Sequence, residues 1–470
     1  MTGVRVLAVW LLACLMALGC PRGTQASFGE FTIRDELELA RKFDLIIETR
    51  FPVIEDTRIT GYVQSIVDRI VATMPPQPFP IKVTVVKNGA LNAFASAAGH
   101  ITIFTGLIVN LAGEDELASV IAHELAHVSE RHIARSIEKS QLVGAGSLLG
   151  MLAAVLVGSQ GGGEGASAMA LGTVAGAKAM QLKYTRENEK DADQFGLDYL
   201  VEAGFSPNGM VSAFDKMRKL QWISGGGEVP SYLSTHPGID DRLGYMQERV
   251  ARLPKAVRDK RSDDTAYARV KMLVQAWYTD ANSALALFSA PSKPTCQDRL
   301  GQAIALSRLG RAEDAGKRFS DALACNPSDT LWKREYGRYA FEFGDLASSV
   351  KALQETVLRE PGDLYALFFY ARAVAEQGNY AASVSAMERV AKEVPRDSEV
   401  LENLARYQAA MGRAFDAHLN YAKAFAYKRQ FTKYSFHMEK ADALASGAKE
   451  RERLGQVRQE IAEYRDILGI

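Results

Sequence analysis

The sequence predicts a mainly helical protein, in which an α+β domain with a small β-sheet is followed by a solenoid of paired helices. Three observations support this prediction. Two short stretches alternate apolar and polar residues, which is typical of strands. A His-Glu-x-x-His motif lies in an apolar helical stretch after them. In the C-terminal half, glycine and proline recur with a period of 34 residues, which is typical of a helical repeat.

Size and charge limit the classes of function. A chain of 470 residues has room for two to four domains. The 56 basic and 56 acidic side chains give a net charge of zero. Nucleic-acid binding usually requires a basic face or stripe, so the composition argues against a nucleic-acid partner.

The N-terminus has the order of a secretory signal, which we place at residues 1–26. Arg5 precedes an apolar run, 6–19, that is too short to span a bilayer. Two readings remain for its end. Either the chain is cut before Cys20, or before Cys14 in a similar segment, and that cysteine then carries a lipid, or it is cut after Ala26 as an ordinary signal. Both predict a periplasmic protein, and the first adds a lipid anchor in the outer membrane.

The first domain is expected to begin with helices and to continue with a sheet. The pattern from 28 to 74 is helical, and four prolines between 75 and 80 then exclude a helix. Residues 81–86 and 100–105 alternate as strands do. A helix is expected from Glu114, because acidic residues crowd the start of the next apolar stretch.

We expect this domain to span residues 28–253 and a charged linker to follow at 254–264. Two small-residue stretches in the domain, 142–157 and 166–182, are separated by glycines. They predict a helical hairpin that is either buried in the domain or lies on a membrane surface. Neither stretch has the roughly 20 uninterrupted apolar residues that a membrane span needs.

The C-terminal region, residues 265–470, is periodic. Its glycines and prolines keep a step of 34 residues: Gly310, Gly344, Gly378 and Gly412, with Pro327, Pro361 and Pro395. The period resembles that of the tetratricopeptide repeat, a helix–turn–helix unit with glycine in its turn. We expect four repeats from about Cys296 to Tyr427, capped by helices at 266–278 and 449–468.

The repeats favour a groove that binds protein segments, because solenoids expose long curved surfaces. The alternative is a dimerisation or packing scaffold. The number of residues between Cys296 and Cys325 suits the two ends of one helical hairpin. In an oxidising compartment they form a disulfide or remain two buried thiols.

The first domain contains a candidate metal site. His123 and His127 are four residues apart and therefore share one helix face, as two nitrogen ligands of one zinc ion require. Glu124 lies beside the first histidine and is placed to act as general base. Apolar neighbours predict a buried helix, where these polar groups are costly without a partner. The alternative is a hydrogen-bonded network in the core.

A second helical stretch supplies two acidic candidates. Glu189 and Asp193 are four apart and share a face, whereas Glu187 and Asp191 belong to a solvated face. Glu189 is expected as the third zinc ligand. Asp193 is expected to accept a hydrogen bond from His123 and so to fix its tautomer. One zinc ion per chain is the cofactor that this set predicts.

Together these motifs resemble the metallopeptidase family that includes the heat-shock membrane protease HtpX and the CaaX prenyl proteases. The His-Glu-x-x-His motif, the segment Glu189–Asp193 and the repeat tail support the resemblance. It implies a zinc-dependent endopeptidase of the cell envelope that acts in outer-membrane protein quality control. Its partners would be unfolded or misassembled envelope proteins, the outer-membrane assembly machinery through the repeats, and a membrane surface.

The resemblance also assigns residues outside the two helices. His236 and Arg242 match a later motif, and in close relatives such a histidine occupies the open zinc position and keeps the enzyme latent. The alternative is that His236 orients substrate or packs near the cleft. Arg242 would stabilise developing charge. Residues 92–94 resemble the segment before the strand that pairs with substrate backbone. His132 and His418 match no motif and are expected at the surface.

Two functions from different classes follow. The first is a zinc endopeptidase that degrades misfolded or stalled envelope proteins, with chaperone-like binding through the repeats. The second is a mainly non-proteolytic chaperone or assembly adaptor whose peptidase site is latent. A third, weaker reading is a membrane-embedded protease that uses the hairpin at 142–182.

Overall fold

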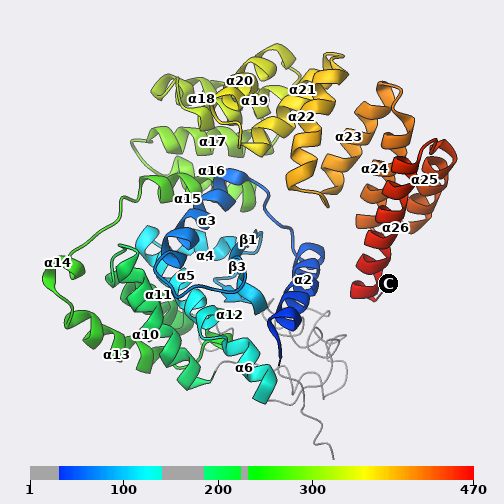
Figure 1. The fold of residues 1–470 in the computed structure, drawn as a ribbon. Coiled ribbons are helices and arrows are strands. Elements are labelled where there is room, and N and C mark those ends of the chain that lie inside the picture. Colours follow the sequence, from blue (N-terminus) through cyan, green and yellow to red (C-terminus); the bar gives the residue numbers. More distant parts are fainter. Residues whose placement is uncertain (1–30, 140–184, 224–230, 470) are drawn as a thin grey trace, which may run out of the picture.

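The computed structural model describes residues 31–139, 185–223 and 231–469 (Figure 1). The predicted signal with Cys20 and the predicted hairpin at 142–182 lie outside these ranges. Within them, no helix combines the length and apolar character that crossing a membrane requires. The predicted fold class is confirmed, because a helical domain with one small sheet precedes a series of helical hairpins (Figure 1).

The first domain surrounds a three-stranded sheet with helices. Its elements are α2 (Ile33–Arg50), α3 (Thr57–Val71), β1 (Lys82–Val86), β2 (Ala93–Ala95), η1 (Ala97–Gly99), β3 (His100–Phe104), α4 (Thr105–Asn110), α5 (Glu114–Ser129), α6 (His132–Lys139), α10 (Arg186–Glu202), α11 (Asn208–Ile223), α12 (Ser231–Thr235) and α13 (Ile239–Ala251). The short α14 (Lys255–Arg258) follows in the segment expected as a linker.

The sheet has the order β1-β3-β2, with β1 parallel and β2 antiparallel to β3. The two strands expected from alternation are β1 and β3. The third strand, β2, was not expected, because Ala93–Ala95 is too short to show a period. It lies at the edge of the sheet against α5, so this edge faces the helix that carries the candidate metal ligands.

Helix α5 forms the centre of the domain. Three acidic residues occupy its first turn, where the helix dipole favours negative charge, as the sequence predicted. Almost the whole helix is buried, since α3, α10 and α11 and strand β2 pack around it. The pair of histidines therefore lies in the interior of the domain rather than on an exposed surface.

The C-terminal half is built from antiparallel helix pairs. Its elements are α15 (Thr265–Tyr278), α16 (Ala281–Ser289), α17 (Cys296–Arg308), α18 (Ala312–Cys325), α19 (Thr330–Glu342), α20 (Leu346–Arg359), α21 (Leu364–Glu376), α22 (Tyr380–Glu393), α23 (Ser398–Ala410), α24 (Ala414–Tyr427), α25 (Phe431–Leu444) and α26 (Ala448–Leu468). Figure 1 shows the pairs following one another along an arc.

The periodic glycines lie where the sequence placed them, in the turns between paired helices. Gly310, Gly344, Gly378 and Gly412 all have positive φ angles, which glycine adopts without steric cost. Gly337 has a different role, in the interior of α19. A Cβ atom there would lie 2.7 Å from Leu353, so glycine permits the close approach of α19 and α20. The hairpin of α17 and α18 is also closed by a disulfide between Cys296 and Cys325, with their Cα atoms 5.9 Å apart.

The two halves share a continuous apolar core, which runs from the first domain into α19. Helix α15 packs against α3 and α4, and the Tyr267 hydroxyl donates to the Ile108 carbonyl oxygen at 2.7 Å. Buried charges also cross the boundary. Arg334 of α19 donates to both carboxylate oxygens of Asp56, at 2.7 and 2.8 Å. These contacts hold the repeats against the first domain.

Candidate metal centre

Two imidazoles of α5 point to the same place. His123 and His127 are fully buried, and their Nε2 atoms are 3.1 Å apart. Helical spacing of four residues produces this arrangement, as the sequence predicted. Both Nδ1 atoms face away from the shared point and contact other groups, which leaves the two Nε2 atoms to face a common ligand.

Helix α10 brings a carboxylate to the same point. Thr185 caps its N-terminus by accepting a hydrogen bond from the Asn188 amide. One turn of helix then places Glu189 with Oε1 3.4 Å from His127 Nε2 and Oε2 3.6 Å from His123 Nε2. The close approach depends on Gly196, where a Cβ atom would lie 3.1 Å from the Ala122 carbonyl oxygen.

His236 joins this group from the turn between α12 and α13. Its Nδ1 atom lies 3.0 Å from Glu189 Oε1 and 3.3 Å from His123 Nε2. Its ring stacks on Tyr232 with centroids 4.3 Å apart, which fixes the ring plane. One donor atom from each of His123, His127, Glu189 and His236 lies within 4.8 Å of the others, and all four residues are buried.

This donor set fits a zinc ion. Imidazole nitrogens and one carboxylate are ordinary zinc ligands, and the four donors lie within 4.8 Å of one another. The neighbouring Glu124 supports the fit. Its Oε2 atom accepts a hydrogen bond from the Ala95 amide of β2 at 2.9 Å, whereas its buried Oε1 atom accepts none from the described residues. A buried oxygen without a hydrogen bond is costly unless a ligand completes the site.

Burial also sets the protonation of Glu124. Removal from water raises the pKa of this carboxyl, and the nearby charge of Glu189 raises it further, while His236 and His123 oppose both effects. A carboxyl whose pKa is raised is better suited to accept and return a proton near neutral pH. Glu124 therefore has the properties of a general base beside the donor set.

Asp193 lies beside His123, the contact that the sequence led us to expect. Its Oδ1 atom lies 2.9 Å from His123 Nδ1, on the side of the ring opposite Nε2. Arg242 donates to Asp193 through Nε at 2.8 Å and through Nη2 at 2.7 Å, and the Tyr245 hydroxyl donates as well. Burial alone would raise the pKa of Asp193, but Arg242 and the His123 hydrogen bond outweigh it and lower the pKa to about 2.

Arg242 lies between two carboxylates. Besides Asp193, it contacts Glu189, with Nη1 2.5 Å from Oε2. The charges of His236 and Arg242 outweigh the effect of burial and hold the pKa of Glu189 well below its usual range. Arg242 thus keeps the carboxylates of Glu189 and Asp193 ionised and holds both in position.

His132 is a site residue that the sequence interpretation missed. It was expected at the surface, but its side chain is buried and its Nδ1 atom lies 2.8 Å from Nδ1 of His127. The turn before it places it there, since Arg131 adopts a positive φ of 50° and reverses the chain. Arg131 is held in turn by Glu36 of α2, to which its Nε donates at 2.8 Å. Arginine gives no signal for such a turn, which glycine usually occupies.

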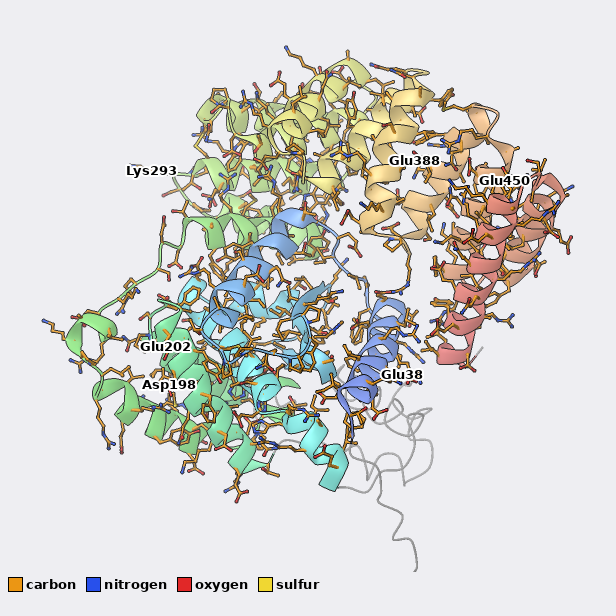
Figure 2. The ribbon with its side chains drawn as sticks, in the orientation of Figure 1. Glu38, Asp198, Glu202, Lys293, Glu388 and Glu450 are labelled. Carbon is orange, nitrogen blue, oxygen red and sulfur yellow. A yellow bond between two sulfur atoms is a disulfide. The ribbon has the colours of Figure 1, made fainter. Side chains whose placement is uncertain are left out.

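The face of α10 that points away from Glu189 and Asp193 is exposed. Glu187 and Asp191, assigned to a solvated face, are exposed. Figure 2 shows Asp198 and Glu202 further along this helix, at the outer surface of the domain. The helix is therefore divided into a buried acidic face toward the donor set and a solvated acidic face.

His418, also expected at the surface, is partly buried and pairs with His437 through Nδ1 atoms 2.8 Å apart.

The family comparisons agree with this architecture. Residues 57–250 match the model of peptidase family M48, and residues 300–357 and 337–398 match the tetratricopeptide repeat model. The chain thus contains a peptidase family M48 domain followed by tetratricopeptide repeats.

Three similar individual proteins share one name. The chain is 31% identical over 263 residues to the putative beta-barrel assembly-enhancing protease of Vibrio cholerae, covering 56% of this chain and 53% of the relative. It is 29% identical to the beta-barrel assembly-enhancing protease of Yersinia pestis, covering 66% and 63%. The protein of that name from Escherichia coli (strain K12) is 26% identical, covering 67% and 64%. The chain thus spans between half and two thirds of the length of these curated relatives.

Similarity to solved structures is weaker. A tetratricopeptide repeat protein from Parabacteroides merdae has a TM-score of 0.28 and 14% identity, and the match covers 52% of this chain and 98% of that protein. A score this low adds nothing to the description of the fold.

Proposed function

We propose that the protein is a zinc-dependent endopeptidase whose metal is held by His123, His127 and Glu189. The observation that carries the proposal is the convergence of these donors beside Glu124, which has a buried oxygen without a hydrogen bond from the described residues. The peptidase family M48 match over residues 57–250 supports the same reaction class.

In this proposal the chain's own groups have separate tasks. A bound zinc ion would polarise the scissile carbonyl and increase the acidity of water. Glu124 accepts the proton of the attacking water on Oε1 and later returns it to the leaving amine. The Ala95 amide holds Oε2 of the same carboxylate, so that Oε1 is oriented toward the site. Asp193 fixes the tautomer of His123, which leaves Nε2 as the ligand atom.

Substitution of Glu124 by glutamine tests this reaction. Glutamine keeps the shape but cannot act as a base, and loss of general-base catalysis typically costs about 100- to 10,000-fold in rate. Cleavage of an unfolded protein should fall by that amount, measured by gel densitometry with zinc content determined in parallel. Glu202→Gln, an exposed change on α10, should have no effect. Equal cleavage by wild type and Glu124→Gln at equal zinc content would refute the enzyme.

His236 is proposed to keep the site latent. Its Nδ1 atom lies beside Glu189 and His123, in the position that water or substrate would need. Replacement by alanine removes a donor that competes for this position. The His236→Ala protein should therefore cleave the unfolded substrate faster than wild type while it retains zinc. Slower cleavage with unchanged zinc content would instead favour a role of His236 in orienting substrate.

The substrates and location are proposed from the relatives and the N-terminus. Relatives at 26–31% identity are named as proteases that enhance β-barrel assembly. We therefore propose a periplasmic enzyme, soluble or anchored through Cys20, that acts on unfolded or misassembled outer-membrane proteins. The repeats would supply chaperone-like binding and contacts with the assembly machinery.

The adaptor function remains the second candidate, because His236 lies among the donors and disfavours constant activity. Complementation of a cell that lacks the protein distinguishes the adaptor function from the protease function. If Glu124→Gln restores envelope integrity as well as wild type does, while a chain without its repeats does not, the adaptor role predominates. If Glu124→Gln fails, proteolysis is required.

A further inference from the structure

A cavity of about 220 Å³ lies between the repeats and the first domain. Helices α19, α21 and α22 and the start of α23 supply most of its wall, and Glu55 of the first domain completes it. Glu55 precedes α3 and is accessible to water, although protein surrounds it on most sides. The cavity is therefore a composite of both halves of the chain.

Aromatic rings form the apolar part of this wall. Phe369 contacts Phe368 and Phe341 edge to face, with ring centroids 5.2 and 5.9 Å apart. The guanidinium of Arg372 lies over Phe341 at 4.8 Å from the ring centroid. The same guanidinium lies 5.2 and 5.5 Å from the centroids of Phe368 and Phe369, so an alkyl chain of a ligand would pack on the ring surface that Arg372 leaves uncovered.

The arginines of the wall are already paired. Arg338 donates to Glu342 at 2.8 Å, and Arg372 donates to Glu399 at 3.2 Å. Each positive charge is thus balanced by a glutamate of the repeats. The remaining acidic groups of the wall determine which charge the cavity favours.

Two carboxylates remain without a cation. Glu55 and Asp397 line the cavity together, and neither forms an ion pair with any residue in the described ranges. Asp397 caps α23 and accepts hydrogen bonds from the amides of Glu399 and Val400. Burial raises the pKa of Glu55 to about 7, with further contributions from the charges of Asp397 and Glu48. With four carboxyl groups against two arginines, the wall keeps a net negative charge although Glu55 is only partly ionised near pH 7, and a cation bound beside Glu55 would favour its charged form.

The position of Glu55 is fixed by its neighbours. Asp56 is bound by Arg334, and Arg58 donates to Asp363 at 2.8 Å. Both contacts join the first domain to the repeats within three residues after Glu55. The carboxylate is held in the wall by these ion pairs.

A larger cavity of about 980 Å³ adjoins the first, and Glu55, Val394 and Asp397 line both. It extends from these residues to α2 and the outer edge of β1. An extended polypeptide has room to follow this space and to direct one side chain into the smaller cavity.

We propose that the smaller cavity binds a lysine or arginine side chain of an extended protein segment, whose alkyl stem packs on Phe341, Phe368 and Phe369 while its charge meets Glu55 and Asp397. The occupant follows from charge complementarity, since the wall combines an apolar surface with two unpaired carboxylates. A segment bound in this way contacts both domains. The inference rests on the partner-binding role of the repeats within the proposed function.

The test measures binding rather than cleavage, in the full-length Glu124→Gln protein. The probe is a capped, dye-labelled peptide, Ser-Gly-Phe-Lys-Phe-Gly-Ser, and the readout is fluorescence polarisation. A matched peptide with acetyl-lysine keeps the stem and removes the charge. We expect the lysine peptide to bind at least about fivefold more tightly than the acetylated one, as expected when one partly desolvated ion pair is lost.

The matched variants are Glu55→Gln and Glu202→Gln, which remove one carboxylate charge at the cavity and one at the outer surface of α10 (Figure 2). Glu55→Gln should remove the preference for lysine, and Glu202→Gln should leave it intact, with equal melting temperatures for both. Equal binding of the two peptides, unchanged preference in Glu55→Gln, or no binding up to about 1 mM peptide would each overturn the proposal. Failure here leaves the cleavage result with Glu124→Gln unaffected, because binding and cleavage are separate readouts.

Discussion

The interdomain ion-pair cluster and the metal-site cluster are both buried, and they differ in how their charges are balanced. In the interdomain cluster, Arg334 binds Asp56 with two hydrogen bonds and Glu335 with two more, and all three side chains are 1% exposed. In the metal-site cluster, Glu124 and Glu189 lie among His123, His127 and His236. The first cluster balances its carboxylates with one guanidinium, whereas the second contains Arg242 and also gathers imidazole and carboxylate donors that a metal ion would use.

This difference distinguishes buried charges that stabilise the fold from buried groups that are placed to bind a ligand. A buried charge is tolerated when partners within the chain satisfy it, and the interdomain cluster meets this condition with guanidinium groups. The metal-site cluster leaves Glu124 Oε1 without a hydrogen bond from the described residues. Beside a converging donor set, the oxygen without a hydrogen bond points to a ligand, whereas the hydrogen-bonded Arg334 cluster points to a fixed interface.

The largest expected effect comes from Arg334→Ala. Removal of one partner leaves Asp56 and Glu335 as buried charges without their guanidinium, which typically costs about 3–5 kcal/mol. We expect the free energy of unfolding to fall by that amount. It is measured by denaturant titration with near-UV circular dichroism as the signal. Because a two-domain chain need not unfold in one step, calorimetry should show whether the repeats separate from the first domain first.

Arg249→Ala is the matched control for this prediction. Arg249 also binds a carboxylate with two contacts, both at 2.8 Å, but its partner Asp198 lies at the outer surface (Figure 2). Solvent screens such a pair, so the loss should stay below about 1 kcal/mol. Equal destabilisation by the two alanine substitutions would show that burial of the Arg334 cluster contributes little.

Local patterns in the sequence predicted the repeats and the ligand helix well. A period of 34 residues fixed the turns at Gly310 and its three equivalents, because each unit depends mainly on its neighbours. The spacing of His123 and His127 predicted their common direction, since a helix relates residues four apart. Both predictions depend on short-range geometry, which a single sequence contains.

Long-range geometry could not be predicted in the same way. Nothing in the sequence pairs Asp56 with Arg334, which is 278 residues away, because complementary charges occur throughout a chain with 56 of each sign. Strand β2 is too short for alternation to reveal it. The burial of His132 depends on an arginine in a left-handed turn, which sequence patterns do not indicate.

The smaller expected effect concerns His132, which contacts a metal ligand instead of an interface charge. If zinc binds Nε2 of His127, the proton lies on Nδ1, and Nδ1 of His132 accepts it across 2.8 Å. Loss of such an outer partner typically weakens metal affinity about 10- to 100-fold. His132→Ala should therefore raise the zinc dissociation constant by this factor, measured by competition with a chromogenic chelator.

Two further variants separate this positioning role from a packing role. His132→Asn retains a hydrogen-bond acceptor and should recover part of the lost zinc affinity, whereas a packing role would make it no better than alanine. His437→Ala removes a histidine from the pair with His418 in the repeats and should leave zinc affinity unchanged. If His132→Ala lowers the melting temperature while its zinc dissociation constant equals that of wild type, the contact with His127 does not position the ligand, and other contacts such as those of Asp193 and Arg242 support the metal-site cluster.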